Sequence, residues 1–224
     1  MEPWNLPASY VCLVVITILT SLYGAKGQDK RSATISNGEK ALTNEFPFMV
    51  SLQQTDSAQG TQYSHTCGAS ILNSRYLLTA AHCFSDNFPW IAVYGDNSNI
   101  CTNLQTCKHI KVSNIYIHPD YLSQGYEVLN DIAIVKLESD LPINGNTVKA
   151  ASIEIGSVPT DGSFSSIIAG WGTILDNREL PSDLMKAKIP IVSMTSCLDI
   201  GLVAESPQQV CAGAGNGIGM LFDG

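Results

Sequence analysis

Short apolar runs separated by polar, turn-forming segments dominate the hydrophobic pattern of the chain. The runs have the length of β-strands and are rich in β-branched residues, which favours strands over helices. Gly, Asn, Asp, Ser and Pro fill the segments between them, as tight turns require. The predicted strands lie at 46–52, at 69–79 with a bend at Asn73-Ser74, and at 91–94, 110–117, 132–137, 166–169 and 188–192.

Helical periodicity is weak, because no amphipathic run is longer than about two helical turns. Only 79–83 and 193–200 are expected to be short helical pieces, the second with Ser193 as its N-cap. Many short strands with regular turns predict an all-β sandwich or barrel. The polar, turn-rich stretch 139–148 is the best candidate for a connector between two halves.

The first residues have the pattern of a cleaved targeting sequence. Residues 11–23 form an uncharged apolar run that is too short to span a bilayer comfortably. Ala25 and Gly27 are small residues in the places that signal peptidase requires, which leaves Gln28 as the new N-terminus. The stretch before the run contains Glu2 and no Lys or Arg, so a retained signal anchor is the alternative. We expect a signal peptide at 1–27 and a secreted, extracellular protein.

The composition of the chain is typical of a folded protein. Of the 224 residues, 45% are hydrophobic and only 14% are charged, which is enough apolar material for a core and argues against disorder. The net charge of -8 argues against nonspecific binding of nucleic acid, which needs clustered Lys and Arg to contact phosphates.

Export makes the cysteines informative, because disulfides form in oxidising compartments. Cys12 lies in the signal peptide, and six cysteines remain. Six cysteines allow 15 pairings, and no C-x-x-C spacing points to a metal cluster. The solution that is local in sequence has three bridges, which are Cys67–Cys83, Cys101–Cys107 and Cys197–Cys211.

Two polar residues stand at the ends of predicted strands. His82 follows two alanines in 79–83 (TAAHC), and a cysteine fixes the next position, so its imidazole is held in a tight turn. Asp131 directly precedes the apolar strand at 132–137. A carboxylate at the edge of a core is costly unless it is paired. An imidazole N–H would be a suitable partner and would fix the histidine tautomer.

These segments together resemble the trypsin/chymotrypsin family of serine endopeptidases. The resemblance extends from Ile35 to about Met220 and follows the family's order of motifs. The matching motifs are 65–70 (HTCGAS), 79–83 (TAAHC), 130–133 (NDIA), 170–172 (GWG) and 210–213 (VCAG).

The resemblance implies two antiparallel Greek-key β-barrels, at 35–140 and 149–224, after a short propeptide at 28–34. It implies that His82 is the general base and then the general acid, and that Asp131 orients it, while a serine attacks the peptide carbonyl to give an acyl-enzyme. It also implies peptide or protein substrates, protein inhibitors as further partners, and a monomer. No cofactor, metal, nucleic acid or membrane partner is expected.

The chain departs from the family where the nucleophile is expected. The family's serine lies in a Gly-Asp-Ser-Gly-Gly motif shortly after the segment that matches Cys211. Here the region reads 215–224 (GNGIGMLFDG), no serine follows Ser206, and Leu221 stands where a cysteine is usual. We therefore expect an incomplete second barrel and no hydrolysis by this polypeptide, because His82 has no hydroxyl to activate.

The resemblance also implies a mature N-terminus and a residue at the base of the specificity pocket. Ile35 is the candidate mature N-terminus, although Thr34 precedes it instead of Lys or Arg, and Lys30-Arg31 lies further back. If Leu221 takes the cysteine's place, the base of the specificity pocket falls on Gly219. Glycine offers no charge to a basic side chain, so we expect cleavage after apolar or aromatic residues.

Two functional hypotheses remain open. In the first, the sequence is an incomplete record of a working protease, which the intact His82 and Asp131 motifs favour. In the second, the protein is an inactive protease homologue that acts as a binding or decoy protein, which Leu221 and the irregular activation site favour. The mass of the native protein, or the 3′ end of its transcript, separates them.

Overall fold

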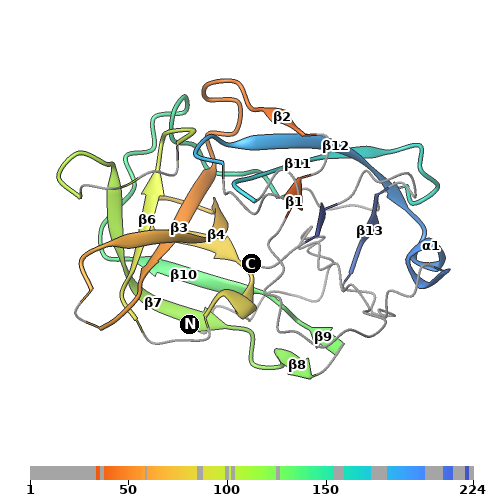
Figure 1. The fold of residues 1–224 in the computed structure, drawn as a ribbon, viewed down its shortest axis with the longest axis horizontal. Helices are drawn as coiled ribbons and strands as arrows, with labels where there is room; N and C mark the ends of the chain where they lie inside the picture. The colour runs from red at the N-terminus through yellow and green to blue at the C-terminus, as the bar shows by residue number, and fades with distance from the viewer. Residues whose placement is uncertain are drawn as a thin grey trace.

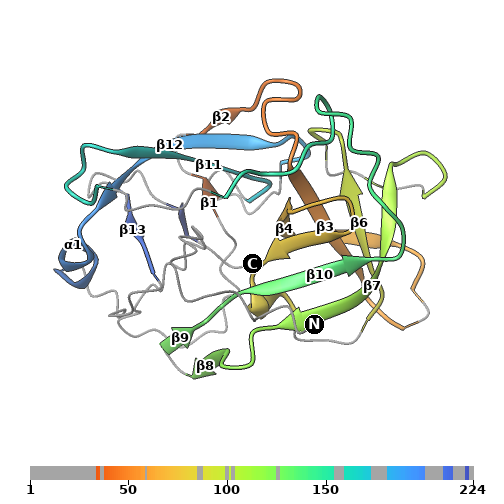
Figure 2. The ribbon, with the colours of Figure 1, turned by 180° about the vertical axis from the view of Figure 1, so that it is seen from behind.

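The structure is a computed structural model that describes residues 34–35, 38–58, 60–84, 88–98, 101, 104–124, 127–153, 159–172, 181–199, 209–213 and 220–221. A closed barrel forms one half of the molecule and a smaller sheet lies in the other half (Figure 1). The view from behind shows the same division (Figure 2).

Six antiparallel strands close the barrel in the order β10-β5-β4-β3-β6-β7. β3, β4 and β5 follow one another as a meander, and β6 then returns to lie beside β3, which is a Greek-key arrangement. The strands are β3 (Met49–Thr55), β4 (Tyr63–Ile71), β5 (Tyr76–Thr79), β6 (Trp90–Tyr94), β7 (His109–Ile117) and β10 (Ala133–Leu137).

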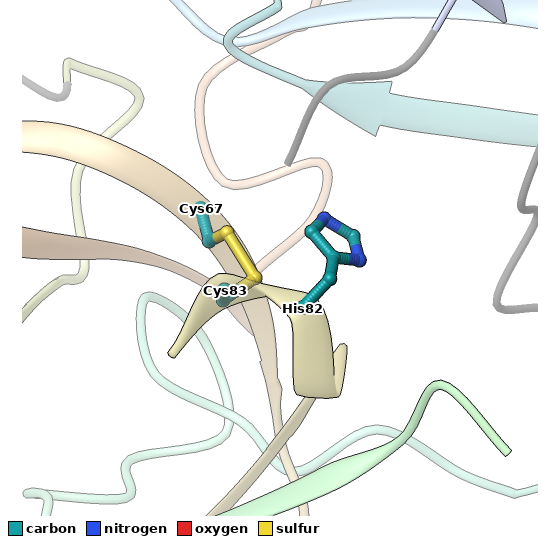
Figure 3. Close-up of side chains that lie close together, drawn as sticks. All are labelled: Cys67, His82 and Cys83. Carbon is teal, nitrogen blue, oxygen red and sulfur yellow. A yellow bond between two sulfur atoms is a disulfide. The ribbon is translucent and has the colours of Figure 1, made fainter. Parts of the chain in front are cut away.

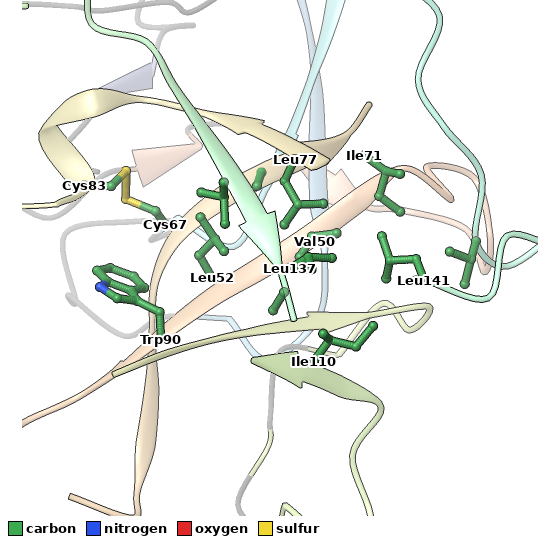
Figure 4. Packing of buried hydrophobic residues seen from close by; sticks show 14 residues of the cluster. Val50, Leu52, Cys67, Ile71, Leu77, Cys83, Trp90, Ile110, Leu137 and Leu141 are labelled. Atoms are coloured by element: carbon green, nitrogen blue, oxygen red, sulfur yellow. A yellow bond between two sulfur atoms is a disulfide. The ribbon is translucent and has the colours of Figure 1, made fainter. Parts of the chain in front are cut away.

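Alternation of buried and partly exposed side chains explains why these sequences form a barrel. Along β10, every second residue from Ala133 to Leu137 is buried, as a strand with one face on a core requires. The buried side chains of the six strands meet inside the barrel, together with the Cys67–Cys83 disulfide (Figure 4). Leu141 and Val148, from the segment after β10, belong to the same core.

The second half contains a four-stranded antiparallel sheet among the described residues. β11 (Ser165–Gly170) pairs with β12 (Met185–Val192), and β12 pairs with β13 (Cys211–Ala212). β2 (Glu39–Lys40) also pairs with β12, so the N-terminal segment reaches across to this half. The helix α1 (Met194–Asp199) follows β12.

The described residues contain five further short elements. β1 (Thr34–Ile35) pairs with β14 (Met220–Leu221), and β8 (Leu122–Gln124) forms a hairpin with β9 (Glu127–Leu129). The 3-10 helix η1 (Ala81–Cys83) follows β5. No helix in the described parts of the chain is long and apolar enough to cross a membrane.

Asn97 and Trp171 join the two halves. The Trp171 ring is 2% exposed, and its Nε1–H donates to the Asn97 carbonyl at 2.8 Å. The Leu184 N–H donates to the same carbonyl at 2.7 Å. The Asn97 side chain donates in turn to the carbonyls of Ala41 and Leu42, each at 3.0 Å. One residue therefore connects the end of β6 to the N-terminal segment and to the second sheet.

The all-β fold class predicted from the sequence is confirmed, with a first barrel that closes and, among the residues described in the second half, a four-stranded sheet. The expected helical pieces also exist, as η1 and α1, and the Ser196 N–H donates to the hydroxyl of the capping Ser193 at 3.3 Å. The strand predicted at 46–52 was wrong in its first three residues. There the chain turns at Pro47, and the Met49 N–H bonds to the Phe46 carbonyl instead of a neighbouring strand.

Several sequence-based expectations fall outside the described residues or are not tested. The signal peptide at 1–27, residues 28–33 of the propeptide and Gly219 lie outside them. The division into 1–27, 28–34 and 35–224, with barrels at 35–140 and 149–224, stays a prediction.

A partly buried histidine, His65, lies where the barrel meets the second half. His65 Nδ1 shares a hydrogen bond with the Ser51 hydroxyl at 2.8 Å, and Gln53 Nε2 donates to the same hydroxyl at 3.1 Å. The imidazole packs edge-on against Trp171, with ring centroids 5.4 Å apart. Burial lowers the pKa of His65 from 6.5 to about 4, because desolvation disfavours the charged imidazole.

We predict that His65 makes the fold less stable in acid. The pKa of His65 is lower in the folded than in the unfolded chain. Above pH 6.5 the ring is mostly neutral in both states, so its burial does not lower the free energy of unfolding. Stability is lost as the pH falls from 6.5 to about 4, by at most about 3 kcal/mol. His65→Phe removes the titrating group and keeps a ring beside Trp171. Urea unfolding at pH 7 and pH 4.5 should show a smaller loss for the variant, and an equal loss would contradict this role.

Candidate functional site

The pairing of β5 with β10 brings the two predicted catalytic residues together. Thr79, the last residue of β5, lies opposite Ala133, the first residue of β10. The chain leaves β5 toward His82 and enters β10 from Asp131, so both residues lie at the same end of this strand pair. Antiparallel register alone therefore brings close two residues that are 49 positions apart in the sequence.

The turn that carries His82 is fixed on both sides. Ala80 keeps an extended backbone conformation, and the chain then tightens into η1. Cys83 is bonded to Cys67 of β4, and the Thr79 hydroxyl donates to the Gly68 carbonyl at 2.8 Å. The His82 ring lies beside this disulfide (Figure 3). The two small alanines allow the turn to lie against the barrel, and Ala81 is 1% exposed.

Asp131 holds His82 through both of its carboxylate oxygens. Oδ1 accepts the backbone N–H of His82 at 2.9 Å, and Oδ2 lies 2.6 Å from the imidazole Nδ1. A carboxylate accepts hydrogen bonds, so this contact favours the tautomer with the proton on Nδ1. Nε2 is then the basic nitrogen of the neutral ring.

The two side chains differ strongly in burial. The Asp131 side chain is 4% exposed, whereas the His82 side chain is 35% exposed. Burial of a carboxylate is costly unless hydrogen bonds replace its hydration, and both of its oxygens have a partner here. The arrangement is a buried acceptor that orients an accessible base, which is the geometry that general acid–base catalysis requires.

Tyr121 lies near this pair and is affected by it. Burial raises the pKa of the Tyr121 hydroxyl, a hydrogen bond with Ser123 lowers it, and the negative charge of Asp131 raises it further. The net shift is upward, so the phenol stays neutral and adds no second negative charge beside Asp131. Tyr121 was not predicted as part of the site, because nothing in its local sequence marks it as a neighbour of Asp131.

The six cysteines that follow the predicted signal peptide are all bonded in the structure. The pairs are Cys67–Cys83, Cys101–Cys107 and Cys197–Cys211, which is the pairing local in sequence. These bonds fit an oxidising, extracellular environment. Among the described residues, two groups of side chains have the proximity of metal ligands, one with His82 and one with His109, but both consist otherwise of bonded cysteines. Their sulfurs cannot act as thiolate ligands while they are bonded to each other.

The remaining predicted site residues are only partly placed. Ile35 lies in β1, where it is the partner of Met220, so its backbone belongs to a two-stranded sheet. Gly219, the candidate base of the specificity pocket, lies outside the described residues. The structure therefore brings His82 and Asp131 together and leaves the pocket position untested.

Comparison with known proteins places the chain in a family. The sequence profile of the trypsin family matches residues 35–219. Chymotrypsin-like elastase family member 1 of Bos taurus is 29% identical over 215 residues, which cover 92% of this chain and 76% of that protein. Chymotrypsin-C of Rattus norvegicus is 32% identical over 191 residues, which cover 84% of this chain and 68% of that protein.

Solved structures agree with this assignment. The structure of neuropsin, a serine protease expressed in the limbic system of mouse brain, superposes with a TM-score of 0.64 at 27% identity, over 82% of this chain and 76% of that chain. The structure of GrC has a TM-score of 0.67 at 22% identity, over 80% of this chain and 76% of that chain, and supports the fold alone. The profile match and these relatives show that the chain belongs to the trypsin family of chymotrypsin-like serine proteases.

Proposed function

We propose that this protein is a secreted serine-type endopeptidase of the chymotrypsin family, which cleaves peptide bonds through an acyl-enzyme. The observation that carries the proposal is the contact of 2.6 Å between His82 Nδ1 and Asp131 Oδ2. A buried carboxylate bound to an accessible imidazole is the base and orienter pair of the serine-protease mechanism.

His82 has two roles in this mechanism. Its Nε2 takes the proton of the attacking serine hydroxyl, and the imidazolium later gives that proton to the leaving amine. Asp131 holds the ring in the required tautomer and stabilises its positive charge. The mechanism also needs an attacking serine, and none follows Ser206 in the 224 residues.

The expected biological setting follows from the family and the disulfides. Proteins or peptides are the substrates that the protease family indicates, and protein inhibitors are the further partners we propose. We also propose a monomer that is exported by the segment 1–27, trimmed in the region 28–34, and needs no cofactor or metal. Three disulfides support export.

An inactive protease homologue is the second candidate function. Leu221 stands where the family has a cysteine, and Thr34 stands where the activation site has Lys or Arg. Thr34 and Leu221 are also strand partners, so the segment that a protease of this family frees during activation is held in a sheet. A protein of this kind would bind substrates or inhibitors without cleaving them.

We predict that the 224-residue polypeptide does not hydrolyse peptide esters and does not react with a serine-directed phosphonate. A product of the complete transcript that adds the serine should be labelled and active. In that product, Asp131→Asn should lower kcat by about 10⁴-fold, the effect described for the orienting aspartate of this family. Sequencing the transcript's 3′ end and labelling the native secreted protein test both points. A native protein of full length that is not labelled would favour the decoy function instead.

The proposed specificity gives a separate prediction. If Gly219 forms the base of the specificity pocket, a basic substrate side chain finds no negative charge there, and a buried cation without a partner is strongly disfavoured. An active form should therefore cleave after apolar or aromatic residues. Sequencing the products of a peptide library measures this preference, and dominant cleavage after Lys or Arg would show that the pocket base lies elsewhere.

A further inference from the structure

The turn that presents Asp131 depends on an unusual backbone conformation at the residue before it. Asn130 has φ of 52°, in the left-handed region that side chains other than glycine rarely adopt. Its carbonyl accepts the N–H of Ile132 at 2.8 Å, which closes a three-residue turn centred on Asp131. Asparagine tolerates this region better than other residues with side chains, because its short amide bonds locally.

Two hydrogen bonds tie this turn to one neighbouring segment, residues 118–121. On one side of Asp131, Asn130 Nδ2 donates to the Asp120 carbonyl at 2.9 Å. On the other side, the Ile132 carbonyl accepts the N–H of His118 at 3.0 Å. The anchoring segment is itself a closed turn, because the Tyr121 N–H donates to the His118 carbonyl at 3.0 Å.

The position of Asp131 between these two bonds must be precise, because its carboxylate makes two contacts with His82. Its two carboxylate oxygens must meet two different atoms of His82 at the same time. A rotation of the main chain at Asp131 would improve one contact only at the expense of the other. The bond from Ile132 uses backbone atoms, so any residue there could make it, whereas the bond from Asn130 depends on its side chain.

We propose that Asn130 is a positioning residue for the base of the proposed protease. It acts in two ways: its backbone conformation forms the turn, and its amide anchors that turn to the Asp120 carbonyl. The catalytic importance of this role rests on the proposed function. The contact between Asp131 and His82 that Asn130 positions needs no nucleophile to form. Asn130 touches no reacting atom and acts through Asp131.

Three variants separate the two actions. Asn130→Gly keeps the left-handed backbone and removes the anchor. Asn130→Asp tolerates the backbone and has no N–H to donate to the carbonyl. Asn130→Ala removes the anchor and also opposes the backbone conformation.

The readout is the proton NMR resonance of the His82 Nδ1–H in the full secreted protein, together with its rate of exchange with water. We expect exchange to be about fivefold faster in Asn130→Gly and Asn130→Asp, which is the effect of losing one ordinary hydrogen bond. The resonance should also move toward the position of an unbonded imidazole. Asn130→Ala should show a larger change than either.

Asn44 offers a matched control, because it is the other described residue with a side chain and a positive φ, at 61°. Asn44→Ala opposes the backbone in the same way as Asn130→Ala, and Asn44 makes no bond to the segment 118–121. This control should lower stability and leave the His82 resonance and exchange rate unchanged. A change as large as that of Asn130→Ala would show a general loss of stability, and the proposal would fail.

Three further outcomes would test the role of Asn130 or the proposed function. Unchanged resonance and exchange in both Asn130→Gly and Asn130→Asp would overturn the role of the amide, and both variants keep the backbone that folding requires. A native protein without any such resonance would lack the His82–Asp131 contact, and the proposal would fall with it. A native protein that shows the resonance but cleaves nothing would refute the proposed function alone.

Discussion

Pairing between β5 and β10 is the interaction on which both the barrel and the candidate site depend. β10 bonds to β5 on one edge and to β7 on the other, so it is the strand that closes the ring. The same pairing sets Thr79 against Ala133, and the segments just outside that pair carry His82 and Asp131. A shift of register by one residue would turn the buried face of β10 outward. The hydrophobic alternation that stabilises the barrel therefore also fixes the geometry of the site.

The candidate site could be predicted from sequence where it depends on local motifs. The TAAHC and NDIA segments identified His82 and Asp131, and the structure shows them in contact. Their catalytic roles stay a prediction. The surroundings could not be predicted in the same way, because Tyr121 and the Asp120 carbonyl meet the site only after the chain has folded. Asn130 was part of a recognised motif, but its backbone conformation and its bond to Asp120 have no signature in a single sequence.

The fold was predictable where strands are long enough to show a pattern. Runs at 110–117 and 132–137 correspond closely to β7 and β10. The pairs β1–β14 and β8–β9 consist of strands of two or three residues, which are too short for any periodicity to appear. The contact between the halves at Asn97 was also missed, because three of its four bonds use main-chain groups of distant segments, to which any sequence could contribute. These groups are the carbonyls of Ala41 and Leu42 and the N–H of Leu184.

Closure of the barrel by β10 has a consequence for how the chain folds. Because β10 is the last of the six strands in sequence and must pair with β5 across residues 80–132, which include β6 to β9, its pairing carries a high cost in loop-closure entropy. Contacts between strands that are distant in sequence are typical of slow folding. The chain loses the entropy of loop closure before the pairing gains any free energy. His82 and Asp131 meet only when this last strand is in place. The base pair of the site thus forms together with the finished barrel, and a partly folded chain does not yet have it.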